Sequence, residues 1–387
     1  MHPDSHRTSG IPRIVIVGAG FSGLWAARTL ADKKCDVLVV DKNNYHTFLP
    51  LLYQVAAAEL ESEQIAYPVR GIFRSADNVS FAMAQVTGLD QERKVLLTDS
   101  LNIPYDRLIV APGSVTNFFG VPGADEYAFR LKSLEQAMFL RNHIMGCFER
   151  AALSTDPAEQ RRLLTFTVVG GGPTGVEYAG ALAELIRGPL SKDFPPLIVG
   201  QARVVLFEAM DGILFGFPDH LRMAALIALR RKGVQVFLGA QVQEVAPRHV
   251  LLKDGSNFLT ETVAWTAGVK AHPLARALGL PCAPNGKVLV DEHLRVQGMP
   301  DVLACGDVCQ IEGQPPLPMI APAAIQTGRH AAQTVLREMK GKKPKRFKYF
   351  DKGSMATIGR GAAVVRFRGR NYTGFMAWAS ATGCWCW

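Results

Sequence analysis

Two stretches of this chain repeat the same local pattern, and that repeat limits the fold more than any other feature. Residues 14–27 and 166–179 each read as a short apolar strand, a glycine-rich turn and a helix rich in alanine. A second apolar strand follows each stretch and ends in an acid, Asp41 in the first and Glu208 in the second. Continuous apolar strands that alternate with helices are typical of parallel sheets buried on both faces. The repeat therefore predicts an α/β protein with two doubly wound, Rossmann-like sheets.

The two glycine turns share the spacing G-x-G-x-x-G. The first glycine permits a tight turn, the second lets the backbone approach a pyrophosphate, and the third lets the helix pack closely on the strand. The helix N-terminus then presents free N–H groups to the phosphates. Two such turns predict two dinucleotides, and the simplest pairing is FAD in the first turn and NADH in the second. The two triplets are Gly18, Gly20 and Gly23, and Gly170, Gly172 and Gly175.

The two strand-end acids stand where a carboxylate accepts hydrogen bonds from a ribose diol. Glu208 lies 38 residues after Gly170, and an insert at 188–196 with three prolines explains this long spacing. Because a carboxylate repels a 2′-phosphate, Glu208 predicts NADH over NADPH. The alternative for Glu208 is a solvated charge at a strand end.

The composition excludes several classes of protein. The 387 residues are 48 % apolar and 20 % charged, which is enough apolar material for full cores. No apolar run reaches the length of a transmembrane helix, and the polar first ten residues lack the core of a signal peptide. Seven scattered cysteines form neither a disulfide framework nor a zinc pattern, so no metal is predicted.

The net charge of +9 is concentrated near the end of the chain. Residues 337–370 hold twelve Lys and Arg against two acids, a net +10, so the rest of the chain is close to neutral. Such a patch predicts an anionic partner, with a solvated face as the alternative. No nucleic-acid-binding module accompanies the charge, so a membrane surface is predicted and nucleic acid is not.

Three longer segments, residues 41–54, 170–180 and 353–361, resemble the type II NADH dehydrogenases. These are single-subunit NADH:quinone oxidoreductases among the flavoproteins with two dinucleotide-binding domains. The resemblance extends over about residues 12–378. It implies the glutathione-reductase-like FAD/NAD(P) fold, non-covalent FAD, NADH as the donor, a membrane quinone as the acceptor and no proton pumping. A homodimer stays among the open alternatives.

The same resemblance divides the chain into parts. The FAD-binding domain is expected at 12–123 and 268–340, interrupted by the NADH-binding domain at 124–267, and residues 341–387 form a basic C-terminal segment. Relatives usually continue beyond Trp378 with amphipathic helices that dock on the membrane, so we expect a truncated C-terminus, too short for an anchoring helix. The predicted location is peripheral, on the cytoplasmic face of the inner or plasma membrane, with a soluble protein as the alternative.

The resemblance also carries site residues onto this chain. It implies that Glu177 orients a carboxamide or relays a proton to the quinol, with a helix-terminal acid that stabilises the dipole as the alternative. The helix from Ala321 matches the segment that faces flavin and quinone. Gln326 there is the expected quinone donor, whereas Pro322 replaces the usual first glutamine and leaves the quinone preference open. Lys352 matches a lysine near the flavin, or is a salt-bridged surface lysine. The expected FAD contacts are Gly18, Gly20, Gly23, Asp41, Lys42, Val86, Asp307, Ala324 and Lys352, and the expected NADH contacts are Gly170, Gly172, Gly175, Glu208 and Gly268.

Two other functions stay open. One is another FAD-dependent NAD(P)H reductase of the same fold, acting on ferredoxin, rubredoxin or a soluble acceptor. Thiol–disulfide and sulfide chemistry is disfavoured, because no close cysteine pair lies near the first glycine turn and residues 151–267 contain no cysteine. The other is a flavoprotein that binds NADH without quinone turnover.

Overall fold

The computed structural model describes residues 10–384 and divides the chain into two compact units. The polar N-terminus predicted to lack a signal peptide, up to residue 9, and the last three residues of the short tail lie outside the described residues. Among the described residues, unit 1 consists of 10–47, 66–115 and 269–350, and unit 2 consists of 48–65, 116–268 and 351–384.

Unit 1 is built on an eight-stranded sheet with the order β23-β20-β21-β22-β9-β1-β2-β5. Strand β1 is buried along its whole length and pairs in parallel with β2 and β9. This is the arrangement that a continuous apolar run predicts, because such a strand needs cover on both faces. The strands are β1 (Arg13–Val17), β2 (Asp36–Asp41), β5 (Val79–Met83), β9 (Arg107–Val110), β20 (Val288–Val290), β21 (Arg295–Val296), β22 (Met299–Ala304) and β23 (Cys309–Ile311).

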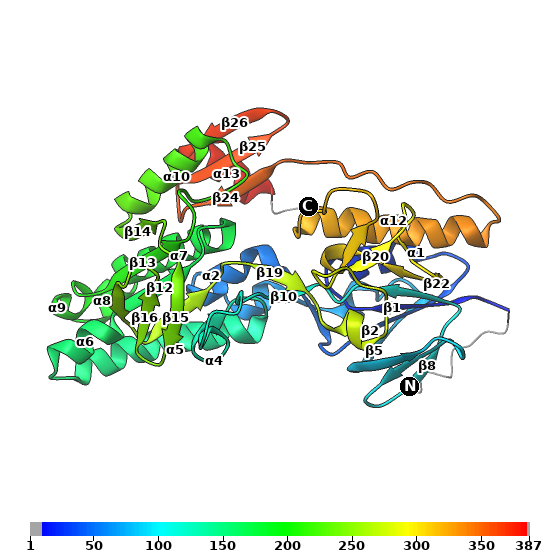
Figure 1. The fold of residues 1–387 in the computed structure, drawn as a ribbon, viewed down its shortest axis with the longest axis horizontal. Helices are drawn as coiled ribbons and strands as arrows, with labels where there is room; N and C mark the ends of the chain where they lie inside the picture. Colours follow the sequence, from blue (N-terminus) through cyan, green and yellow to red (C-terminus); the bar gives the residue numbers. More distant parts are fainter. Residues whose placement is uncertain (1–9, 385–387) are drawn as a thin grey trace. The chain divides into compact units, whose positions relative to one another are not determined.

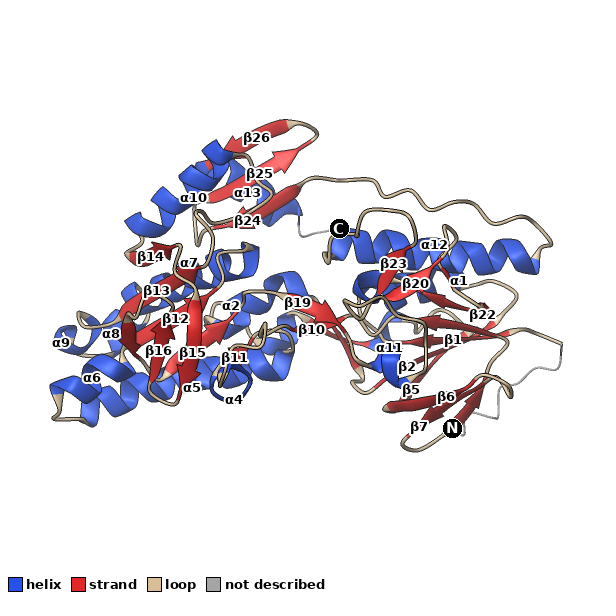
Figure 2. Ribbon diagram, in the orientation of Figure 1, coloured by secondary structure: helices blue, strands red, loops and turns tan. Residues whose placement is uncertain are grey.

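Helices α1 (Phe21–Leu30) and α12 (Ala321–Met339) lie side by side on one face of this sheet (Figure 2). They approach closely because Gly328 has no side chain: a Cβ there would lie 2.1 Å from the Ser22 carbonyl oxygen. Helix α12 has the bounds predicted from the sequence, with Pro322 in its first turn. The other elements here are β3 (Tyr45–Thr47), β4 (Ala66–Pro68), α3 (Val69–Ile72), β6 (Val86–Asp90), β7 (Val95–Thr98), β8 (Asn102–Pro104), β10 (Ser114–Thr116), β19 (Val269–Ala271), α11 (Leu274–Ala277) and η4 (Gly306–Val308).

Unit 2 contains a five-stranded sheet with the order β11-β18-β12-β13-β14. Its central strand β12 pairs in parallel with β13 and β18, which repeats the pairing of β1 with β2 and β9. The predicted α/β class with two Rossmann-like sheets is therefore confirmed, and among the described strands only β21 in the sheet of unit 1 pairs antiparallel with its neighbours β20 and β22. The strands are β11 (Phe129–Arg130), β12 (Thr165–Val169), β13 (Arg203–Glu208), β14 (Val234–Leu238) and β18 (Thr262–Trp265), with an antiparallel sheet of β15 (Val242–Ala246), β16 (His249–Leu252) and β17 (Asn257–Leu259).

Helix α7 (Pro173–Arg187) follows the second glycine turn and contacts α2 (Leu52–Ala56), so residues 48–65 cluster with unit 2. Pro173 suits the first helical position, because its missing N–H would have no partner there. The remaining helices of unit 2 are η2 (Leu49–Leu51), η3 (Ser62–Gln64), α4 (Ala124–Tyr127), α5 (Leu134–Leu153), α6 (Pro157–Leu163), α8 (Leu190–Asp193), α9 (Pro196–Val199) and α10 (Asp219–Arg231).

The C-terminal part of unit 2 has more structure than its composition suggested. It forms a three-stranded antiparallel sheet of β24 (Ser354–Thr357), β25 (Ala363–Phe367) and β26 (Arg370–Thr373), followed by α13 (Gly374–Cys384). Figure 1 shows these elements in red beside α10. Three buried side chains form their small core: Ala363, Val365 and Ala377. Among residues 10–384, no helix combines the length and the apolar character needed to cross a bilayer.

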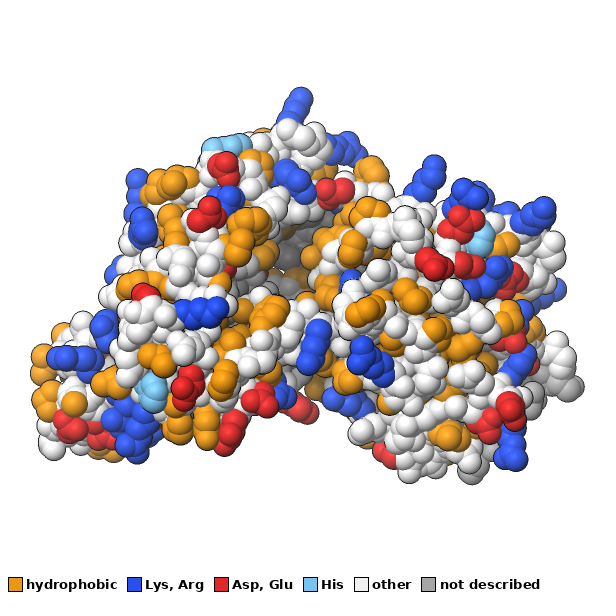
Figure 3. All heavy atoms as spheres, in the orientation of Figure 1, with side chains coloured by type: hydrophobic (Ala, Val, Ile, Leu, Met, Phe, Trp, Pro, Cys, Tyr) orange, Lys and Arg blue, Asp and Glu red, His pale blue; other side chains and the backbone are white. Residues whose placement is uncertain are grey.

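The basic linker that follows α12, residues 340–350, belongs to unit 1 and forms neither helix nor strand after its first residues. Its Phe347 is buried and donates its N–H to the Glu292 carbonyl at 2.7 Å. The Lys345 carbonyl lies within hydrogen-bond distance of His293 Nδ1 and His330 Nε2, at 2.8 and 3.0 Å. The lysine side chains of this linker are exposed. In Figure 3, Lys and Arg side chains lie over the end of α12 and the chain after it, with acidic side chains among them.

Candidate functional site

The first glycine turn is shaped by close backbone contacts at two of its three glycines. Gly18 has a φ of +101°, and a Cβ there would lie 2.4 Å from the Ala111 carbonyl oxygen. A Cβ on Gly23 would lie 1.8 Å from the Gly18 carbonyl oxygen. Gly20 differs, because no heavy atom lies within 4 Å of a Cβ built there. The backbone at Gly20 therefore faces free space at the N-terminus of α1, where the sequence predicts a pyrophosphate.

The Ala19 peptide inside this turn is held from both sides. Asp41 Oδ2 accepts the Ala19 N–H at 2.7 Å, and Asp41 Oδ1 accepts the Asn43 N–H at 2.8 Å. His46 Nδ1 lies 2.8 Å from the Ala19 carbonyl, and burial lowers the pKa of His46, so we assign a neutral ring that donates there. Each carboxylate oxygen has two lone pairs, so Asp41 keeps acceptors for a ribose diol. His46 was not predicted as a site residue. The sequence marked it only as part of residues 41–54, one of the segments that carry the family resemblance.

Asp307 lies in η4, directly after β22. Its Oδ2 accepts the Ser114 hydroxyl at 2.5 Å. The preceding Gly306 has a φ of +80° and donates its N–H to Thr327 Oγ1 on α12 at 3.0 Å. A Cβ on Gly306 would lie 3.9 Å from the Ala324 Cβ. The structure thus brings the Asp307 turn next to the start of α12, where Ala324 lies.

Three other predicted flavin contacts are exposed or only half-buried, in contrast to the tightly packed glycines of the first turn. Lys42 directly follows Asp41 and is exposed. Val86 begins β6 and is half-buried against the core of unit 1. Lys352 is exposed and belongs to unit 2, and no acid among residues 10–384 forms an ion pair with it. The alternative of a salt-bridged lysine therefore does not describe Lys352.

The second glycine turn, in unit 2, repeats the contacts of the first. Gly170 has a φ of +106°, and a Cβ there would lie 2.4 Å from the Ala267 Cα. A Cβ on Gly175 would lie 1.9 Å from the Gly170 carbonyl oxygen. Gly172, like Gly20, has no heavy atom within 4 Å of a Cβ built there. Both turns therefore have the same shape and the same open middle glycine.

Glu208 has the place in unit 2 that Asp41 has in unit 1. Its Oε2 accepts the Gly171 N–H at 2.6 Å, and its Oε1 accepts the Met210 N–H at 2.8 Å. The carboxylate is thus bound by backbone on both oxygens rather than freely solvated. It also lies directly beside the turn that is predicted to hold the pyrophosphate.

Sequence reasoning missed a loop, residues 209–218, that folds back on the second turn. The Leu214 N–H donates to the Gly171 carbonyl at 2.7 Å. Arg222 on α10 holds this loop in place, because its Nε donates to the Ile213 carbonyl at 3.0 Å. No sequence signal marked Arg222, since an arginine on a helix is usually only a surface charge. Its role follows from the hydrogen bond to Ile213, nine residues earlier in the chain.

Gly268 packs against an aromatic ring of unit 2. A Cβ there would lie 2.7 Å from the Phe119 Cζ, and the Gly268 carbonyl accepts the Asn117 N–H at 3.0 Å. Trp265 Nε1 donates to the Asn117 carbonyl at 2.9 Å. Packing alone thus accounts for a glycine at 268, and the expected NADH contact of Gly268 stays a prediction.

Glu177 on α7 is a buried carboxyl in a chain of polar contacts. It is 8 % exposed, and its Oε1 accepts the Thr357 N–H at 3.2 Å. Thr357 Oγ1 lies 2.7 Å from the Tyr53 hydroxyl, to which Gln54 Nε2 donates at 3.2 Å. Burial raises the pKa of Glu177 to about 8, so the carboxyl is protonated at neutral pH. A protonated group beyond the first turn of α7 does not act as a dipole-stabilising acid, so that alternative is not supported.

Gln326 on α12 is bonded to the chain that follows the helix. Its Nε2 donates to the Phe350 carbonyl at 2.9 Å, and its Oε1 accepts the Phe350 N–H at 2.9 Å. The amide nitrogen carries two hydrogens, so one remains for another acceptor. Gln326 belongs to unit 1, whereas Glu177 belongs to unit 2.

The cysteines beside Asp307 lack the character of redox thiols. Cys305 and Cys309 are buried free thiols, and burial raises the pKa of each to about 12. Redox-active cysteines instead have lowered pKa values and access to solvent. The structure therefore gives no support to thiol–disulfide or sulfide chemistry at this place.

Solved structures share this fold. The structure of NDH2 from Plasmodium falciparum in complex with NADH matches with a TM-score of 0.89 and 20 % identity, over 96 % of this chain and 93 % of that one. A sulfide:quinone oxidoreductase from Aquifex aeolicus matches with a TM-score of 0.77 and 16 % identity, over 96 % and 89 % of the two chains. At these identities the likeness concerns the fold alone.

Sequence relatives are more specific. Residues 12–328 match the pyridine nucleotide-disulphide oxidoreductase family. The chain is 37 % identical to a type II NADH:quinone oxidoreductase of Mycobacterium tuberculosis, over 98 % of this chain and 85 % of that protein. It is 28 % identical to a type II NADH:quinone oxidoreductase of Staphylococcus haemolyticus, over 94 % and 91 % of the two chains. With both glycine turns and their acids in place, the chain belongs to the type II NADH:quinone oxidoreductases of the pyridine nucleotide-disulphide oxidoreductase family.

Proposed function

We propose that this chain oxidises NADH through FAD and reduces a quinone. The observation that carries the proposal is the duplicated turn. Each unit presents an open middle glycine at a helix N-terminus, beside a carboxylate held by the same turn. Two mycobacterial relatives that cover nearly the whole chain are named type II NADH:quinone oxidoreductases.

The residues present fit the two dinucleotides. Gly20 and Gly172 leave room for a diphosphate to approach the backbone, and Asp41 and Glu208 keep lone pairs for ribose hydroxyls. When bound, FAD supplies the two-electron chemistry that links NADH to a quinone. The chain's own part is to hold the donor and the acceptor in reactive geometry and to supply protons.

We assign the domains and contacts on the same basis. Residues 12–123 and 268–340 are proposed to bind FAD, residues 124–267 to bind NADH, and residues 341–387 to associate with a membrane. The proposed FAD contacts are Gly18, Gly20, Gly23, Asp41, Lys42, Val86, Asp307, Ala324 and Lys352, and the proposed NADH contacts are Gly170, Gly172, Gly175, Glu208 and Gly268.

Glu177 is the proposed proton donor for quinone reduction, which consumes two protons for each two-electron transfer. Its raised pKa keeps a proton on the carboxyl at neutral pH, and the Thr357 N–H stabilises the carboxylate that remains after the proton leaves. Gln326 is proposed to donate its second amide hydrogen to a quinone carbonyl.

Anaerobic absorbance tests the proposed function. NADH should bleach the flavin band near roughly 450 nm, and a short-chain quinone should restore it through repeated cycles. Bleaching without recovery would contradict quinone reduction and favour another acceptor. A band that NADH leaves unchanged would contradict the NADH half of the proposal as well.

Glu208→Gln should relax the preference for NADH over NADPH by about tenfold. Removing the charge removes roughly 1.4 kcal/mol of repulsion toward a 2′-phosphate, a reasonable size for charges near a protein surface. The remaining amide oxygen can still accept the Gly171 N–H, although the bond from the Met210 N–H is lost. The measurement is the ratio of kcat/KM for the two nucleotides, with exposed Glu244→Gln as the matched control. The same ratio in Glu208→Gln and in the wild type would remove this role from Glu208.

We also propose that the basic linker, residues 340–350, binds an anionic membrane surface. Its lysines at 340, 342, 343, 345 and 348 are all exposed. Replacing Lys342, Lys343 and Lys345 by serine should reduce flotation with vesicles that contain anionic lipid, because each lysine near such a surface is worth about 1 kcal/mol. Equal flotation of the variant and the wild type would exclude these lysines as a membrane-binding surface.

The face of the membrane and the formation of a homodimer stay predictions. Light scattering, which measures the mass of the particle in solution, would decide whether the protein is a dimer.

A further inference from the structure

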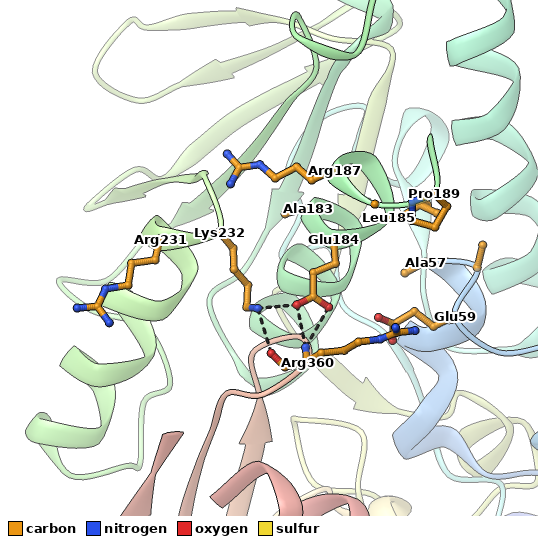
Figure 4. A pocket seen from close by; sticks show the side chains of 12 residues that line it. Ala57, Glu59, Ala183, Glu184, Leu185, Arg187, Pro189, Arg231, Lys232 and Arg360 are labelled. Carbon is orange, nitrogen blue, oxygen red and sulfur yellow. Dashed lines mark hydrogen bonds and ion pairs between the residues drawn. The ribbon is translucent and has the colours of Figure 1, made fainter. Parts of the chain in front are cut away.

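The turn between β24 and β25 is clamped to α7 through the peptide groups of Arg360. The Arg360 N–H donates to both carboxylate oxygens of Glu184, at 2.8 and 2.9 Å. Lys232 Nζ donates to Glu184 Oε1 at 2.5 Å and to the Arg360 carbonyl at 3.2 Å. Figure 4 shows the Glu184 and Lys232 side chains converging on this turn. One ion pair therefore holds both the N–H and the carbonyl of a single residue.

Two glycines let the turn lie directly on the helix. A Cβ on Gly180 of α7 would lie 3.0 Å from the Gly359 nitrogen. Gly359 has a φ of +66°, and a Cβ there would lie 2.5 Å from Glu184 Oε1. Both positions thus exclude a side chain without rearrangement. The turn has little freedom to slide along α7 while the ion pair is intact.

The clamped turn also positions the partner of Glu177. Thr357, the last residue of β24, lies three residues before Arg360 and donates its N–H to Glu177 Oε1 at 3.2 Å. Glu184 lies seven residues after Glu177 on the same helix, which is two turns along one face. Glu177 therefore binds the end of β24 at Thr357, and Glu184 binds the following turn at Arg360.

Glu184 and Glu177 differ in their access to solvent. A pocket of about 500 Å³ opens at Glu184 and is lined by the end of α7, the end of α10 and the loop after α2. Of the charged residues that line the pocket, Lys232, Arg360 and Glu59 lie near Glu184, whereas the Arg187 and Arg231 side chains point away from it (Figure 4). Glu177 instead is buried. Ions and protons in the pocket can therefore act on the clamp without direct contact with Glu177.

We propose that Glu184 and Lys232 are positioning residues for quinone reduction: by clamping Arg360 they hold the Thr357 N–H on the Glu177 carboxyl. This inference rests on the proposed role of Glu177 as proton donor. A hydrogen bond to the carboxylate favours its charged form, so loosening the clamp makes Glu177 release its proton at higher pH. The clamp leaves the glycine turns untouched, so it acts on the quinone half of the reaction alone.

The test uses Lys232→Met and Glu184→Leu in the full-length, FAD-loaded protein, because leucine, unlike glutamine, leaves no acceptor for the Arg360 N–H. The rate at which quinone reoxidises the reduced protein is measured against pH. Both variants should shift the midpoint of this profile upward by about half a pH unit or more and slow reoxidation several-fold. Reduction by NADH should keep its wild-type rate. Lys232→Arg keeps the charge and a donor and should restore the wild-type midpoint.

Arg231→Met is the matched control, because Arg231 is an exposed neighbour in the same pocket and forms no ion pair within residues 10–384. Profiles of Glu184→Leu and Lys232→Met that coincide with that of Arg231→Met would overturn the clamp. If one of the two fails to retain FAD, the other decides, since they remove opposite ends of one ion pair. A Glu177→Gln variant with a normal pH profile would instead refute the proposed function of Glu177.

Discussion

Glu177→Gln should slow the reoxidation of the reduced protein by quinone by roughly 10²-fold and leave reduction by NADH unchanged. A positioned general acid contributes about 10²–10⁴-fold, and glutamine fills the same space without a transferable proton. The amide oxygen can still accept the Thr357 N–H that now binds Glu177 Oε1 at 3.2 Å. Stopped-flow absorbance separates the two half-reactions. The dependence of quinone reduction on pH near 8 should also disappear.

A thermal measurement provides an independent check on Glu177. Burial raises the pKa of Glu177 from 4.5 to about 8, so between these values the folded chain binds a proton that the unfolded chain has lost. The stabilising contribution of this carboxyl is fully present below pH 4.5 and is lost as the pH rises toward 8. As the pH rises through this interval, the Tm of the wild type should therefore fall relative to the Tm of Glu177→Gln. Parallel Tm curves would show that Glu177 is ionised in the folded chain and cannot be the proton donor.

Gly23→Ala should abolish stoichiometric FAD binding and lower the Tm. A Cβ at residue 23 would lie 1.8 Å from the Gly18 carbonyl oxygen, so helix α1 must move away from the turn. Overpacking of this kind costs about 1–3 kcal/mol, although alanine would otherwise favour the helix. The readouts are the FAD content per chain and the melting temperature.

Gly20→Ala separates the cofactor from the fold. No heavy atom lies within 4 Å of a Cβ at residue 20, and the backbone there has an ordinary φ of −69°. The variant should therefore melt like the wild type and yet bind FAD more weakly, because the new methyl group occupies the space left for the diphosphate. Full FAD content in Gly20→Ala would contradict the placement of the diphosphate at this glycine. Full FAD content in Gly23→Ala would contradict the steric argument.

Much of the fold could be predicted because it depends on short-range patterns. The strands β1, β2, β12 and β13 are continuous apolar runs, and α12 begins and ends at the predicted residues. The C-terminal sheet β24–β26 was not predicted, since glycines and basic residues interrupt its apolar positions. Residues 48–65 were expected with the FAD-binding segment, yet they cluster with unit 2 through the contacts of α2 with α5 and α7. No local pattern carries that information.

The sequence by itself determined the two glycine turns and their acids, Asp41 and Glu208. The contacts of Gly23 with Gly18 and of Gly175 with Gly170 act between residues five positions apart, and each acid ends the strand that follows its turn, so local patterns were enough to predict them. Only the tertiary structure decided the surroundings of Glu177. Its partner Thr357 is 180 residues away in the chain, and Thr357 reaches Tyr53 across 304 residues. Burial and a single backbone N–H set the protonation of Glu177, and neither can be read from its neighbours in sequence.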